Sequence, residues 1–144
     1  ALPNQAVVAF EAQLQQELAA MPADAAQNTE VLRMVRQRVG QQAYRQAMLD
    51  YWGGACAVTG LALPQALRAS HAKPWAECAS DAERLDVFNG FLLVANLDAL
   101  FDRFLISFDD TGRLDGFQEA TVKLALQLRQ MGRSFREYLK GLVL

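Results

Sequence analysis

Three side chains carry most of the chemistry that this sequence offers. His71 is the only histidine among 144 residues, which excludes sites that need several histidines. Asp98 and Asp102 are four residues apart in a segment expected to be a short helix, so both carboxylates would lie on one face. Two carboxylates on one face repel each other unless a cation lies between them. This spacing therefore predicts a metal site with hard oxygen ligands.

Short apolar runs bounded by turn residues predict the strands that position these side chains. One strand is expected from about Ala66 to Ala72, so His71 lies near its end. A second strand is expected over Phe91–Val94, and Asn89 comes just before it. The polar stretch between the strands, Glu77 to Phe88, is expected to be a loop. Asn89 precedes a glycine, so it is typical of a turn as well as a candidate functional residue.

Helical patterns flank this centre. Apolar residues recur at helical spacing over residues 5–20 and again over residues 29–50, where Asn28 or Thr29 is the expected N-cap. Gly40 inside the second pattern either weakens the helix or marks a boundary between two helices. The remaining expected elements are a short helix over residues 96–101 with Asn96 as its N-cap, a hairpin over residues 104–114, and a helix over about residues 118–139. The predicted fold class is α+β, with a strand–loop–strand–helix centre wrapped by longer helices.

Composition bounds the class of protein. Hydrophobic residues make up 52% and charged residues 21% of the chain, which is ordinary for a globular domain and excludes disorder throughout. No apolar run approaches the ~20 residues that cross a bilayer, and no secretion signal is visible, so a cytoplasmic protein without a membrane partner is expected. Cys56 and Cys78 match neither a disulfide framework nor a zinc knuckle, and reduced thiols are expected.

The positions of the charged residues along the chain are more informative than the net charge. The net charge of −2 argues weakly against nucleic acid, but the acidic residues gather between Glu77 and Glu119, with basic residues on both sides. This pattern is typical of solvated helix faces, and it also suits a polyanion track beside an acidic metal pocket. Because the arginine fork matches phosphate oxygens, the candidate phosphate contacts are Arg36, Arg38 and Arg45, with Lys73 beside the histidine.

Several separate blocks, taken in order, resemble the HNH endonucleases. The central blocks are Ala69-Ser70-His71-Ala72-Lys73-Pro74-Trp75, Asn89-Gly90-Phe91-Leu92-Leu93 and Leu97-Asp98-Ala99-Leu100-Phe101-Asp102. Two upstream blocks, Gly40-Gln41-Gln42-Ala43-Tyr44-Arg45 and Cys56-Ala57-Val58-Thr59-Gly60, look like the branch found in bacterial restriction-type proteins. The resemblance covers about residues 36–114. The step from Asn89 to Asp98 also equals the usual step from the Asn to the second His of HNH proteins.

This resemblance implies a ββα-metal (His-Me finger) core with one divalent cation. His71 then matches the general base, and Asn89 matches the residue that holds the loop and orients the imidazole. Asp98 stands where the second His ligates the metal, and Asp102 matches a further ligand position in some members. The residue before the base often ligates the metal as Asp or His, but here it is Ser70, a poorer ligand. An all-oxygen set suits Mg²⁺ or Mn²⁺ better than Zn²⁺ or Ni²⁺.

The predicted function is a divalent-metal-dependent DNA endonuclease of restriction or defence type. Two alternatives stay open. One is a catalytically degenerate HNH scaffold that binds DNA or a protein, and the other is a docking domain in which residues 5–20 do the functional work. Residues 1–28 are expected to be an N-terminal helix or linker and residues 29–144 the nuclease domain, with the motif core at 56–114. A homodimer and a fused or separate specificity domain also stay open.

Overall fold

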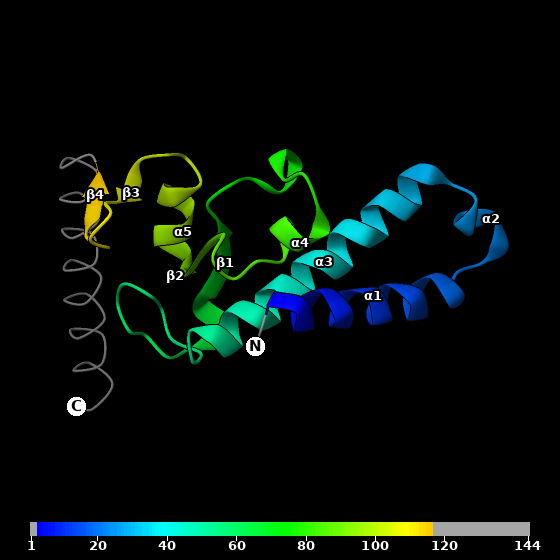
Figure 1. The fold of residues 1–144 in the computed structure, drawn as a ribbon, viewed down its shortest axis with the longest axis horizontal. Helices are drawn as coiled ribbons and strands as arrows, with labels where there is room; N and C mark the ends of the chain where they lie inside the picture. The colour runs from blue at the N-terminus through cyan, green and yellow to red at the C-terminus, as the bar shows by residue number, and fades with distance from the viewer. Residues whose placement is uncertain (1–2, 117–144) are drawn as a thin grey trace, which may run out of the picture. The chain divides into compact units, whose positions relative to one another are not determined.

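Figure 1 shows the computed structural model of the chain, which describes residues 3–116. The chain forms two compact units, Ala1–Ala99 and Leu100–Leu144, and each is described by itself. The helix expected over residues 118–139 lies outside the described residues. The described elements are α1 (Pro3–Ala19), α2 (Ala23–Ala26), α3 (Thr29–Tyr51), the 3₁₀ turn η1 (Pro64–Ala66), β1 (Leu67–His71), the 3₁₀ turn η2 (Trp75–Glu77), α4 (Asp81–Arg84), β2 (Gly90–Val94), α5 (Ala95–Phe101), β3 (Ile106–Phe108) and β4 (Leu114–Gly116).

This mixture of helices and antiparallel strands confirms the α+β class. The patterns over residues 5–20 and 29–50 correspond to α1 and α3. None of the described helices combines the length and the apolar character that crossing a membrane requires.

Helix α3 is the element on which the first unit is built. Its N-cap is Asn28, as predicted, because the side-chain oxygen accepts hydrogen bonds from Glu30 N at 3.0 Å and Val31 N at 3.2 Å. Helices α1 and α4 and both strands of the first unit pack on α3, and Figure 1 shows α1 running beside it. The side chains that these helices bury are Val39, Tyr44, Ala47 and Met48 of α3 and Ala6, Phe10 and Leu14 of α1.

Helix α3 runs through Gly40 without a break, so of the two alternatives left open at this glycine, the boundary between two helices is excluded. A glycine inside a helix costs about 0.5–1 kcal/mol relative to alanine. The contact that needs this glycine is Trp75, because a Cβ at position 40 would lie 2.3 Å from the indole Cη2. The glycine therefore lets the segment after β1 pack directly on the helix.

Strands β1 and β2 form an antiparallel pair in which Ser70 lies opposite Phe91 and His71 opposite Gly90. Both strands lie where the apolar runs predict them. Arg45 of α3 donates hydrogen bonds to Leu67 O and to the carbonyl of Pro64, both at 2.7 Å, so it fixes the start of β1 on the helix. The apolar side chains of this pair that are fully buried are Leu67, Leu92 and Leu93.

Two local expectations are wrong. The polar stretch between the strands is not only a loop, since it contains the turn of helix α4, capped by Ser80 Oγ accepting from Glu83 N at 3.2 Å. Helix α5 begins at Ala95, directly after β2, so Asn96 lies inside the helix rather than before it. The Asn96 side chain accepts from Leu97 N at 3.0 Å, which is a first-turn contact rather than an N-cap.

In the second unit, β3 and β4 pair antiparallel with Phe108 opposite Leu114. The turn between them is organised by Asp109, whose carboxylate accepts from Thr111 N, from Thr111 Oγ1 and from Arg113 N at 2.6–2.9 Å. These bonds, first that with the Thr111 hydroxyl, lower the pKa of Asp109. The hairpin thus lies where the sequence places its turn.

Candidate functional site

His71 is held at the end of β1 by a hydrogen bond from its ring to the backbone. Its Nε2 lies 2.7 Å from the carbonyl oxygen of Arg84 in α4. Because a carbonyl can only accept, Nε2 must carry the proton of this bond, and in the neutral ring the lone pair is therefore on Nδ1. The ring is partly buried. For a neutral ring, this contact favours the tautomer that is protonated at Nε2.

Two aromatic rings fix the plane of this imidazole. The ring of Tyr44 stacks on His71 with the centroids 3.8 Å apart and the planes 23° from parallel. The Trp75 ring meets it at right angles, with the centroids 5.9 Å apart. Tyr44 is 1% exposed, and its hydroxyl donates to the carbonyl oxygen of Asn89 at 3.1 Å. Burial, followed by the negative charge of Asp86, raises the pKa of the Tyr44 phenol, so the hydroxyl keeps its proton.

Asn89 ties the segments around the histidine together. Its Oδ1 accepts from Lys73 N at 2.8 Å, and its Nδ2 donates to Glu83 O at 3.2 Å. Longer contacts join Nδ2 to Lys73 O at 3.4 Å and to Cys78 Sγ at 3.5 Å. Glu83 directly precedes the residue whose carbonyl accepts from His71 Nε2, so the Asn89 amide and the imidazole bind successive carbonyls of one helical turn.

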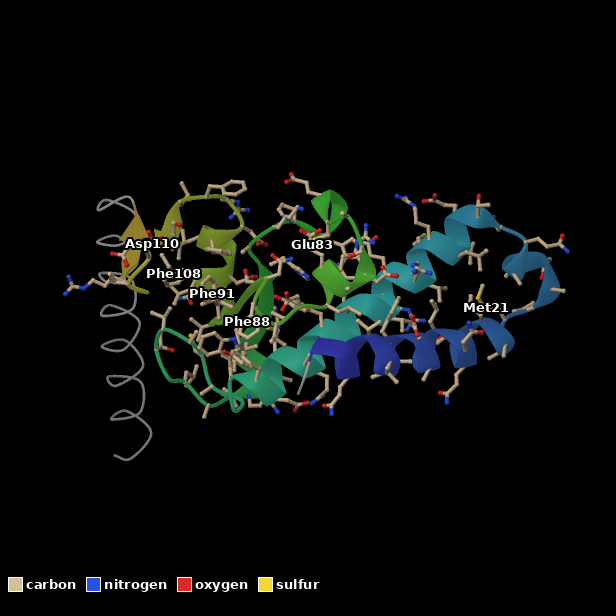
Figure 2. All side chains as sticks on the ribbon, viewed as in Figure 1. Met21, Glu83, Phe88, Phe91, Phe108 and Asp110 are labelled. Carbon is tan, nitrogen blue, oxygen red and sulfur yellow. The ribbon has the colours of Figure 1, made fainter. Side chains whose placement is uncertain are left out.

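Arg84 is a residue that the sequence analysis did not single out. Its guanidinium donates to Trp75 O at 3.1 Å, to Cys78 O at 2.8 Å and to Asp81 Oδ1 at 3.0 Å, and it lies over the Trp75 ring. These bonds hold α4 on the segment after β1 and so place the carbonyl that accepts from His71. An arginine in a polar stretch looks like a solvated charge, and no pattern marked it for this role. Figure 2 labels Glu83, its neighbour in α4.

The candidate metal ligands are not all placed as the spacing suggests. Helix α5 ends at Phe101, so Asp98 lies on the helix whereas Asp102 lies in the turn after it, in the second unit. Ser70 is 2% exposed, and its hydroxyl oxygen has no hydrogen-bond partner among the described residues. Within residues 3–116, no three His, Cys, Asp or Glu side chains form a group that could hold a metal ion.

The chemistry of the predicted oxygen donors is nonetheless compatible with a hard cation. Mg²⁺ is usually bound by one or two carboxylates with waters and substrate phosphate completing its shell, so it does not need a cluster of three side chains. A buried hydroxyl without a partner is costly, and a cation or a bound water would satisfy it. In the first unit, Ser70 has such a hydroxyl, and Asp98 has a carboxylate on α5.

The candidate phosphate contacts lie in two regions, with three arginines on α3 and Lys73 in the segment after β1. Three arginines of α3 already have partners: Arg36 forms an ion pair with Asp81, Arg38 forms one with Glu17 at 2.8 Å, and Arg45 donates to the two carbonyls at the start of β1. Lys73 alone among the four lies in the hydrogen-bonded segment around Asn89. Its ammonium lies 2.6 Å from a carboxylate oxygen of Glu83.

This exposed pair shifts both ionisable groups toward the charged form. The hydrogen bond from Lys73 lowers the pKa of Glu83, and the backbone N–H of Ala79 adds to the effect. The same bond raises the pKa of Lys73. A lysine and a glutamate therefore lie beside the site as full charges at neutral pH.

One comparison with known proteins gives a match, and it covers part of the chain. Residues 56–109 match the family model described as HNH endonuclease, which confirms the predicted resemblance over that segment. No curated protein matches the chain. The family implies a nuclease that acts on DNA and uses a divalent metal. Of the site residues, His71, Asn89 and Arg84 lie inside the matched segment, whereas Tyr44 lies outside it.

Proposed function

We propose that this chain is a DNA endonuclease in which His71 is the general base, working in a bacterial restriction or defence system. The observation that carries the proposal is the 2.7 Å contact between His71 Nε2 and Arg84 O, because it leaves Nδ1 as the basic atom of the neutral ring. The restriction context rests on the resemblance of the blocks at residues 40–45 and 56–60. Cytoplasmic location, a homodimer and an attached specificity domain stay predictions.

The base acts on the attacking water. In hydrolysis of a phosphodiester, the water oxygen bonds to phosphorus while the bond from phosphorus to the 3′ oxygen breaks. The water proton passes to Nδ1 of His71, which later releases it to solvent, and the 3′ oxygen takes up a proton from solvent. An imidazole with a reference pKa of about 6.5 is mostly neutral at pH 7–8 and can accept this proton. The products are a 5′-phosphate and a 3′-hydroxyl.

Asn89 does not contact the substrate in this proposal; it holds the segments that position His71. Its amide joins the Lys73 backbone to the Glu83 carbonyl, so β1, the turn after it and α4 move as one piece. The imidazole is then already oriented when water attacks, so little conformational entropy is lost in the transition state. Fixed geometry raises the reaction rate in this way. This supports the orienting role that the HNH resemblance implies for Asn89.

A divalent cation, Mg²⁺ or Mn²⁺, would be held by Asp98 and Ser70. When bound, such an ion stabilises negative charge on the phosphoryl oxygens and on the departing 3′ oxygen. Asp98 contributes a carboxylate and Ser70 a buried hydroxyl that has no other partner within residues 3–116. Asp102 stays a sequence prediction, since it belongs to the second unit.

Lys73 is the best-placed phosphate contact of the four candidates. Its backbone is bound by Asn89, and its ammonium would exchange Glu83 for a DNA phosphate. Arg36, Arg38 and Arg45 stay predicted contacts. Arg45 would have to give up two carbonyls to reach DNA, so Lys73→Ala is expected to reduce the salt dependence of DNA binding more than Arg45→Ala does.

The test is nicking of supercoiled plasmid with Mg²⁺ or Mn²⁺ by the native chain, His71→Ala and His71→Gln. The glutamine amide can still donate to Arg84 O but cannot accept a proton at neutral pH. This variant therefore distinguishes the role of His71 in packing from its role as a base. Both variants are expected to cleave about 10²–10⁴-fold more slowly than the native chain. Equal cleavage by the native chain and by His71→Gln would remove His71 as the base.

Calorimetry with Mn²⁺ tests the ligand assignment independently of cleavage. Asp98→Asn is expected to weaken binding, while Asp50→Asn, which alters an exposed acid of α3, leaves it unchanged. No cleavage of any DNA by the native chain, together with no specific Mn²⁺ binding, would favour the degenerate scaffold that only binds DNA or protein.

A further inference from the structure

The helix that precedes the HNH segment reaches into the candidate site. Residues 56–109 match the family, and α3 ends before that segment, yet Tyr44 of α3 is stacked on His71 with the ring centroids 3.8 Å apart. The family match alone therefore does not account for the surroundings of the base.

We propose that Tyr44 is a positioning residue for His71, so that α3 is part of the nuclease site rather than only its support. This inference rests on the proposed function of His71 as the general base. Tyr44 makes two contacts that define the site: its ring covers one face of the imidazole, and its hydroxyl donates to Asn89 O at 3.1 Å. One side chain thus binds both residues that the HNH resemblance assigns to catalysis.

The position of the tyrosine ring is itself fixed. Tyr44 is 1% exposed, so the ring has no room to rotate away, and it keeps the imidazole from tilting toward the helix. Gly40, one turn earlier on the same face of α3, admits Trp75, whose ring meets the imidazole at right angles. The two ring contacts set the imidazole plane.

The remaining rotation of the imidazole is fixed by the backbone of α4. The bond from Nε2 to Arg84 O sets the direction of the ring within the plane that Tyr44 and Trp75 define. Together these contacts aim Nδ1 in one direction. Loss of the Tyr44 ring removes the stacking contact while leaving the imidazole chemically intact.

Nuclear magnetic resonance of the full chain tests this directly, because its one histidine gives unambiguous imidazole signals. At about pH 8.5, where a ring of ordinary pKa is neutral, the native His71 ring protons are expected well upfield, with nuclear Overhauser contacts to the Tyr44 ring. The nitrogen shifts are expected to report the tautomer protonated at Nε2. Ordinary proton shifts or an absence of contacts to Tyr44 in the native chain would overturn the proposal, whether or not a variant folds.

Two substitutions separate the ring from the hydroxyl. Tyr44→Phe keeps the stacked ring and should retain the upfield shift and the tautomer. Tyr44→Leu removes the ring and should lose the upfield shift, mix the tautomers, and lower kcat for plasmid cleavage at least about 10-fold with little change in KM. Tyr51→Leu is the matched control, since Tyr51 lies on the same helix but packs against Trp52 and Phe88.

The outcomes separate this inference from the proposed function. Unchanged His71 shifts and tautomer in Tyr44→Leu would refute the positioning role even if the native chain is an active nuclease. A native chain that cleaves no DNA would refute the proposed function, and with it any role in catalysis for the stacking of Tyr44 on His71. The chemical shifts of His71 would still report whether Tyr44 holds the imidazole ring. Loss of activity in Tyr51→Leu equal to that in Tyr44→Leu would refute a specific positioning role for Tyr44, because truncating either tyrosine of α3 would then have the same effect.

Discussion

Replacing Asn89 by alanine should cost both stability and activity, in amounts that the hydrogen bonds around it set. The variant loses the 2.8 Å bond from Lys73 N and the 3.2 Å bond to Glu83 O. Each such bond contributes about 1 kcal/mol net, so the two together contribute about 2 kcal/mol to the free energy of unfolding. The contacts to Lys73 O and Cys78 Sγ, at 3.4 and 3.5 Å, add less.

The activity loss should exceed what unfolding explains. Without the amide, the turn after β1 and the carbonyls of α4 can shift relative to each other, and an error of about 1 Å in the reacting geometry can cost 10²-fold in rate. Asn89→Ala is therefore expected to cleave plasmid about 10–100-fold more slowly than the native chain under conditions where both are fully folded. Asn89→Asp keeps an acceptor for Lys73 N but places a carboxylate against Glu83 O, so its activity should also fall.

Asn28 offers a matched control in the same molecule. Its side chain also makes two hydrogen bonds to the backbone, in this case by accepting from two N–H groups at the start of α3. Asn28→Ala should lose about 1 kcal/mol, as N-cap removal typically does, with no change in cleavage by the folded protein. Urea unfolding of the native chain, Asn89→Ala and Asn28→Ala gives the free energy of unfolding. Plasmid cleavage by the same three proteins, measured at urea concentrations well below the unfolding midpoint, gives the activity. If Asn28→Ala and Asn89→Ala lose activity equally, the positioning argument for Asn89 is wrong.

Much of the fold follows from local sequence signals. The cap at Asn28 and the apolar stripe after it predict α3, and two short apolar runs predict β1 and β2. The errors have a physical cause. Helix α4 has only four residues, and it is held by bonds from Arg84 to Trp75 O and Cys78 O, which no local pattern reveals. Gly40 looked like a helix break because its partner Trp75 is far away in sequence.

The candidate site likewise contains residues that local sequence indicates and residues whose role depends on tertiary packing. His71 and Asn89 could be recognised from their blocks, and the structure joins the segments that carry them. Tyr44 belonged to the apolar pattern over residues 29–50 and to the block of the resemblance at residues 40–45. Neither signal indicated its stacking on His71, because that contact depends on how α3 packs against β1. The two aspartates share a helical spacing in the sequence, but α5 ends at Phe101 and leaves only the first of them on the helix.

Three further results are expected. Gly90→Ala should lose at least about 3 kcal/mol in urea unfolding, because its Cβ would lie 2.0 Å from Ser70 O, whereas Gly54→Ala, with φ +70° and open space, should lose about 1 kcal/mol. Chelation of divalent metal should abolish plasmid cleavage and restoring Mn²⁺ should recover it, while far-UV circular dichroism stays unchanged. Glu83→Gln should destabilise the chain at pH 7, and its difference from the native chain in urea should shrink as pH falls from 4.5. The sign follows from the lowered pKa of Glu83: the bond with Lys73 stabilises the fold above the unfolded pKa and is lost as the folded carboxylate protonates, so a difference that grows on acidification would contradict the pairing.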